Sequence, residues 1–216
     1  MKIFGEKEKI QISYKFKKNP FDEEISWGIL NFYVGNKDIC EIIREEKICK
    51  YEWSLIYLVE WMVNNIDFIL GYDPFPFSSI NNDNLNFMLD SAWRKKIENN
   101  SENLLWFEAL GEWERRHSWS ADDDGSCISN VYFYRRQDEM EIAWNNQDRE
   151  SERIQYKYLI GSEKFKMAYF KDIIIDFLKS IINDFVPNNI ENSKDTNYII
   201  KLKKSFDFWL YKHDLT

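Results

Sequence analysis

The chain has 216 residues, of which 44% are hydrophobic and 17% aromatic. This composition excludes a disordered polypeptide, and a chain of this length can bury a hydrophobic core. The formal net charge of -8 argues against a broad nucleic-acid-binding surface, because phosphate binding relies on clustered Lys and Arg. We therefore expect an acidic globular protein. A protein partner is favoured over nucleic acid, and a basic partner would complement the acidic surface.

The cysteines and the hydropathy indicate the compartment. Cys40, Cys49 and Cys127 match no CxxC spacing, and their odd number fits reduced thiols better than a disulfide framework. The N-terminus is charged and has no apolar signal region. No stretch approaches the roughly 20 apolar residues that span a bilayer. The sequence predicts a soluble cytoplasmic protein without membrane contacts.

The first half predicts strands followed by a helix. Apolar residues alternate over 10–16 and 27–34, and a third short strand is expected over 38–43, which gives an antiparallel meander. An almost continuously apolar helix is predicted over 51–70 and ends at Gly71. Residues 78–84 are rich in Ser and Asn, which is typical of a loop.

The second half predicts a helix ending at His117, a hairpin with strands 128–135 and 139–145, and a strand over 154–161. Two closing helices are predicted over 163–185 and 195–213. The fold class is therefore α+β, with antiparallel strands and a hairpin packed with a long buried helix and two C-terminal helices. We expect a single domain, 1–216; the alternative is a division into 1–145 and 146–216.

The two faces of the predicted hairpin differ. Tyr132 and Tyr134 share one face, where they either stack bases or cover the core, and core packing is favoured by the acidic composition. On the second strand, Glu139 and Glu141 point away from the apolar side chains. This alternation predicts a half-buried strand that presents acids to solvent.

Most residues capable of chemistry lie between Trp106 and Trp144. His117 is expected to close a helix as a protonated ring, which interacts favourably with the C-terminal dipole. Without HExxH, and with His213 as the other histidine near the chain end, no zinc site and no cofactor are predicted.

The alternative is a magnesium-dependent nuclease with a degenerate PD-(D/E)xK-like hairpin. In it, Asp122, Asp124 and Glu141 hold the ion, with His117 as a further catalytic candidate. Trp144 stands in place of the motif's lysine, and the DDDG run that contains both aspartates also suits a plain turn. Catalysis is therefore the less favoured reading. The candidate binding residues of this stretch are its arginines and tyrosines: Arg115, Arg116, Arg135, Arg136, Tyr132 and Tyr134.

Several segments together resemble a known bacterial family. The tryptophan-rich helix, the RHS segment and the hairpin pattern R-x-x-D-x-x-x-I-x-W are carried by Arg115, Arg116, His117, Ser118, Arg135, Asp138, Ile142 and Trp144. Residues 25–145 resemble the accessory region that precedes the peptidase domain in ImmA/IrrE-type metallopeptidases and related phage or defence proteins. Because HExxH is absent, the resemblance implies no peptidase activity.

Together these observations predict a non-enzymatic protein-binding or regulatory module of a prokaryotic defence, mobile-element or stress-response system. Two alternatives stay open: the metal-dependent nuclease with magnesium, and an acidic phage-encoded inhibitor that occupies the nucleic-acid site of a host enzyme.

Overall fold

The structure is a computed structural model that describes residues 1–18, 26–119, 127–147, 154–185 and 194–215. The fold is α+β, as predicted, and its strands pair antiparallel throughout the described sheets. No helix in these ranges is long and apolar enough to cross a membrane.

The first sheet is built on the two strands predicted near the N-terminus, which are confirmed as β2 and β3. Its strand order is β1-β2-β3-β4, and β7 also pairs with β3. The bounds are Lys2–Gly5 for β1, Ile10–Phe16 for β2, Trp27–Val34 for β3, Lys37–Asp38 for β4 and Tyr51–Ser54 for β7. A small separate sheet contains β11 (Gln155–Tyr156), β5 (Ile42–Arg44) and β6 (Lys47–Cys49).

The second sheet contains the predicted hairpin. Its order is β12-β10-β9-β8, with bounds Ile160–Lys166, Glu139–Asn145, Val131–Arg136 and Ser118–Trp119. The hairpin turn contains no glycine; Gln137 supplies the positive φ, at 54°.

Four predicted elements differ from the structure. The helix expected over 51–70 begins at Leu55, because 51–54 form β7 against β3. The strand expected over 38–43 is divided between β4 and β5, which belong to different sheets. The strand expected over 154–161 is divided into β11 and β12, and β12 continues to Lys166, so the following helix begins at Met167 rather than at 163.

Five helices complete the described part of the chain. Their bounds are Leu55–Leu70 for α1, Leu85–Trp93 for α2, Asn100–His117 for α3, Met167–Phe185 for α4 and Lys194–Lys212 for α5. The helix α2 is not predicted from the sequence, whereas α4 and α5 confirm the two expected C-terminal helices.

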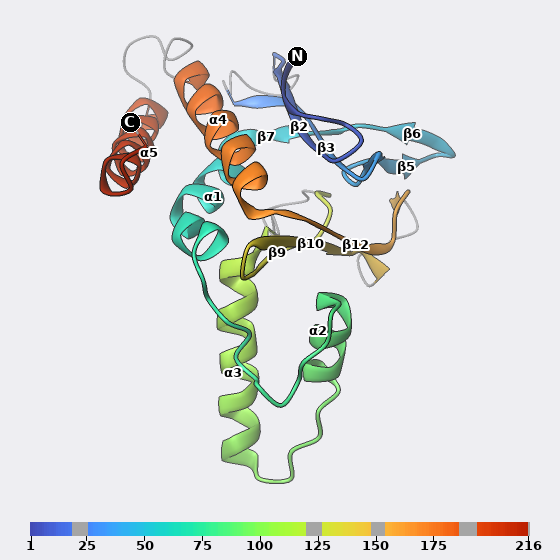
Figure 1. The fold of residues 1–216 in the computed structure, drawn as a ribbon. Coiled ribbons are helices and arrows are strands. Elements are labelled where there is room, and N and C mark those ends of the chain that lie inside the picture. Colours follow the sequence, from blue (N-terminus) through green and yellow to red (C-terminus); the bar gives the residue numbers. More distant parts are fainter. Residues whose placement is uncertain (19–25, 120–126, 148–153, 186–193, 216) are drawn as a thin grey trace.

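The second sheet is covered on both faces (Figure 1). One face packs against the first sheet, with Phe32 of β3 lying 5.0 Å from the ring of Trp119 and 6.3 Å from that of Phe133. The other face carries Tyr132 and Tyr134, which join a second apolar cluster with α2 and α3. The remaining helices α1, α4 and α5 gather at one end of the two sheets. Because both faces are buried, apolar or aromatic side chains stand at successive positions in β9 and β10, from Val131 to Tyr134 and from Ile142 to Trp144.

Candidate functional site

Glu141 is buried, contrary to the prediction that it faces solvent. It has no exposed surface. Its Oε1 accepts a hydrogen bond from the backbone N–H of Leu85 at 2.7 Å, and its Oε2 accepts one from Arg136 Nε at 2.7 Å. Leu85 is the first residue of α2, so the carboxylate lies at the positive end of that helix dipole. Glu141 therefore positions α2, and a magnesium ion there would have to displace Arg136 from a site without access to solvent.

Arg136, Tyr132 and Tyr134 are also part of this packing. The Arg136 guanidinium carbon lies 4.6 Å from the centroid of the Tyr134 ring. Each tyrosine is only 9% exposed, so both cover the core. These three candidate binding residues take part in packing α2 and α3 on the sheet, and of the three Arg136 keeps the most exposed surface, with 19% of its side chain accessible.

Asparagines that the sequence analysis did not single out complete this junction. Asn84 caps α2, with its side-chain oxygen accepting from the N–H groups of Asn86 and Phe87, and its amide donates to Ser162 Oγ of β12 at 2.9 Å. Asn86 donates to the carbonyl of Gly161 at 3.0 Å. An Asn immediately before an apolar run is a helix-start signal, and Asn84 before Leu85 is the one that could have revealed α2.

His117 is the last residue of α3, as predicted, but its ring is not protonated at neutral pH. Burial lowers the pKa of His117 to about 4. The ring stacks on Trp113 at 4.0 Å, and its Nδ1 donates to the Trp113 carbonyl at 2.8 Å. The carboxylate of Asp73 lies 3.8 Å from Nε2. With 1% of its surface exposed, His117 has no access to a substrate.

His117 and Glu141 do not meet. Between them lies a row of side chains in which Trp113 contacts His117 on one side and Tyr134 on the other, at 5.6 Å. Asp122 and Asp124, the other two catalytic candidates, lie outside the described residues. Among the residues that are described, no group of three or more His, Cys, Asp or Glu side chains is placed to hold a metal ion.

The remaining arginines serve different purposes. Arg116 pairs with Asp73 at 3.1 Å and holds the end of α3 against the segment after α1. Arg115 is exposed and pairs with Glu112 on the same helix. Arg135 Nη1 donates to the carbonyl of Leu70 at the end of α1, at 2.8 Å. Of these three, Arg115 and Arg135 lie on accessible surfaces.

The first half of α3 extends away from the core. The buried residues of this helix, Leu110, Trp113 and His117, all lie in its second half. Figure 1 shows the helix projecting from the second sheet, with α2 beside it. Helix α3 therefore forms a projection that presents side chains the core does not use.

Two leucines are the main apolar side chains on this projection. Leu104 is 60% exposed and Leu105 is 65% exposed. The neighbouring rings are used internally, since Trp106 stacks on Phe77 and Phe107 on Trp93. Residues three and four apart share a helix face, so the exposed Glu108 lies beside both leucines. We call Leu104, Leu105 and Glu108 the α3 outer face.

No family model, curated protein or solved structure matches this chain.

Proposed function

We propose that the protein is a non-enzymatic binding module that recognises a partner protein through the α3 outer face. The observation that carries the proposal is the pair of adjacent leucines exposed on a projecting helix. Exposed apolar side chains on a fixed helix face are typical of helix-mediated recognition. The arrangement of His117 and Glu141, both buried and both engaged, favours binding over catalysis.

The charge of this surface favours a basic partner. Glu108 makes no ion pair with any residue that the structure describes, and Glu102, one turn before the leucines, is also exposed. No basic residue occurs from Asn100 to Ala109. Together with the net charge of -8, these carboxylates would accelerate the approach of a basic surface and complement it around an apolar contact.

The resemblance to the accessory region of ImmA/IrrE-type peptidases supports the same role. The resemblance implies an accessory region without peptidase chemistry, and it is the basis for proposing a regulatory module of a defence, mobile-element or stress-response system. An acidic phage inhibitor would use the same surface and differ in its partner, a nucleic-acid-binding host enzyme. A magnesium nuclease would require Glu141 to leave its buried ion pair.

A photo-crosslinking residue at position 105 tests the proposal, with the same residue at position 208 as the control. Phe208 is 68% exposed on α5, so it matches Leu105 in exposure but not in location. A protein that crosslinks from position 105 only is purified and its Kd measured by calorimetry. We expect Leu104→Gln with Leu105→Gln to weaken binding at least about tenfold, because buried apolar anchors dominate interface energy.

Two further measurements can overturn the proposal. The double variant must keep the wild-type Tm, because substitutions of exposed residues change stability little. Association with a basic partner must slow as ionic strength rises. Three results would each contradict a basic partner on the α3 outer face. They are an unchanged Kd in the double variant, an association rate that does not depend on salt, and light scattering that reveals a dimer formed through this face. Magnesium-dependent cleavage of plasmid or RNA that is lost in Glu141→Ala would favour the nuclease.

A further inference from the structure

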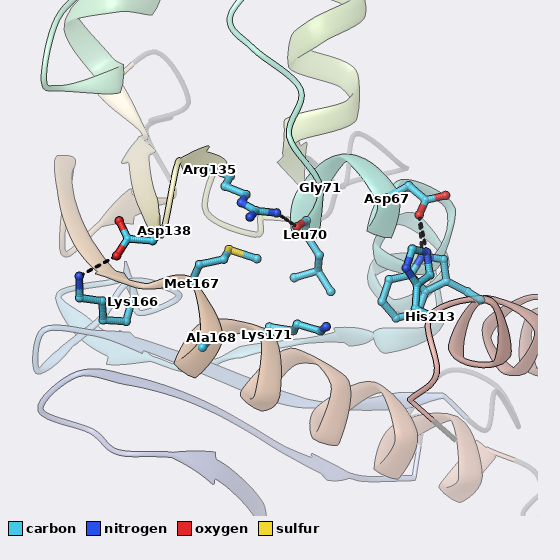
Figure 2. A pocket seen from close by; sticks show the side chains of 11 residues that line it. Asp67, Leu70, Gly71, Arg135, Asp138, Lys166, Met167, Ala168, Lys171 and His213 are labelled. Atoms are coloured by element: carbon cyan, nitrogen blue, oxygen red, sulfur yellow. Dashed lines mark hydrogen bonds and ion pairs between the residues drawn. The ribbon is translucent and has the colours of Figure 1, made fainter.

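A pocket of about 540 Å³ lies where four elements that are distant in sequence meet. Its walls come from the end of α1, the β9–β10 turn, the junction of β12 with α4, and the last turns of α5 (Figure 2). The volume lies in the range of small-molecule sites.

Arg135 brings a positive charge that forms no ion pair with a carboxylate of the described residues. Its guanidinium donates to two backbone carbonyls, those of Leu70 at 2.8 Å and Gln137 at 2.9 Å. Within the described part of the chain it has no acidic partner. The two carbonyls fix the orientation of the guanidinium and leave its remaining N–H groups for another acceptor. A fixed guanidinium of this kind is suited to phosphate or carboxylate oxygens.

Lys171 provides a second cation on the other side of the pocket, one turn into α4 (Figure 2). It makes no hydrogen bond or ion pair with any described residue. The first turn of α4 also lines the pocket at Ala168. Amides in a first helical turn lack acceptors within the helix, so they add to the positive potential that the two cations create.

The acidic residues of the lining lie at the two ends of the pocket, and each already has a partner (Figure 2). Asp138 pairs with Lys166 at 3.0 Å. Asp67 accepts from Trp209 Nε1 at 2.7 Å and lies 3.3 Å from His213 Nε2. The lining therefore carries three cationic side chains, Arg135, Lys166 and Lys171, against two carboxylates, although the chain as a whole carries a net charge of -8.

We infer that this pocket binds an organic phosphate, with the phosphate group held by Arg135 and attracted by the second cation of the lining, Lys171. Two cations in one lining suit a dianion better than a single carboxylate. The apolar side chains of Leu70, Met167 and Trp209 line the same cavity and would receive the organic part of the ligand. The inference is independent of the α3 outer face, which shares no residue with the pocket.

Calorimetry with phenyl phosphate, inorganic phosphate and phenol as probes tests the inference. We expect phenyl phosphate to bind at least about tenfold more tightly than inorganic phosphate, because its ring buries apolar surface, and phenol not to bind. Lys171→Gln should weaken phenyl phosphate binding at least about tenfold, since it removes one of two charges. Its matched control is Lys164→Gln, which removes an exposed lysine of β12 outside the pocket.

The variant should fold normally because Lys171 makes no hydrogen bond or ion pair with the described residues, and an unchanged Tm checks this. Arg135→Lys provides a second variant, which keeps the charge but removes the planar guanidinium and should weaken binding as well. Absence of phenyl phosphate binding at millimolar concentration, equal affinities for the two phosphates, or an unchanged Kd in Lys171→Gln would each overturn the inference.

Discussion

The β9–β10 hairpin is buried on both sides, but the two sides are held by different interactions. The side that faces the first sheet carries Phe133 and Ile142 in a wholly apolar cluster. The side that faces α2 and α3 combines tyrosine rings with the Glu141–Arg136 pair. Apolar burial is strong but non-directional, whereas a buried carboxylate with two donors fixes one position of its partner. Buried apolar surface therefore holds the two sheets together, whereas specific hydrogen bonds fix the position of α2.

The largest effect is expected on the apolar side. Phe133→Ala should lower the free energy of unfolding by about 4 kcal/mol, because it leaves a cavity among Phe32, Trp119 and Phe170. Urea denaturation measures this loss. The same substitution at Phe87, which is 64% exposed on α2, is the control and should have little effect. A loss of less than about 1 kcal/mol at Phe133 would mean that apolar burial does not dominate this side.

A smaller and more local effect is expected on the polar side. Glu141→Gln should cost about 3 kcal/mol, because Arg136 is left without its charge partner, and amide hydrogen exchange should accelerate in α2 more than in α4. Adding Arg136→Met should restore part of the loss. Glu139→Gln, on the same strand, is the control. If it costs as much as Glu141→Gln, or if exchange in α2 is unchanged, then the ion pair does not hold the helix.

The third effect is a pH dependence of the free energy of unfolding, caused by His117 at the C-terminal end of α3. Burial lowers the pKa of His117 in the folded protein to about 4, below the 6.5 of an exposed histidine, so the unfolded chain takes up the proton first as pH falls. The contribution of neutral His117 to the free energy of unfolding is fully present above pH 6.5 and declines as pH falls towards 4. Near pH 5 the loss is about 2 kcal/mol. Denaturation across this window measures the slope. His117→Phe should flatten the slope, whereas His213→Gln should keep it; the reverse pattern would exclude His117 as the cause.

The strands and the central helix could be predicted because their signals are local. Apolar and polar residues alternate within 10–16 and within 27–34, and the hairpin strands are rich in apolar residues. Each of these patterns can be recognised within a few consecutive residues. The helix start at Leu55 could not be read in the same way, since Tyr51 and Trp53 suit a strand or a buried helix equally. Pairing with β3, which is distant in sequence, decides between the two.

The site residues were harder to predict for the same reason. The alternation correctly assigns Glu141 to the face of β10 opposite Ile142, but that face is not exposed, because α2 and α3 cover it. The run Leu104 to Phe107 did contain a signal, because four consecutive apolar residues are too many for one buried helix stripe. Arg135 was identified as a binding residue from its residue type. Lys171, which lines the same pocket, was not, because only the folded chain brings β9 and α4 together.

The projection of α3 also has a mechanical consequence. With a rise of 1.5 Å per residue, the leucines lie about 20 Å from the helix end at His117, which Asp73 and Arg116 clamp. Helix α2 supports it farther out, because Trp106 Nε1 donates to the Ala92 carbonyl at 3.0 Å and Trp93 Nε1 donates to Glu114 at 2.8 Å. The helix is therefore held at its end and along its side, so a partner that binds the two leucines would not have to order them first.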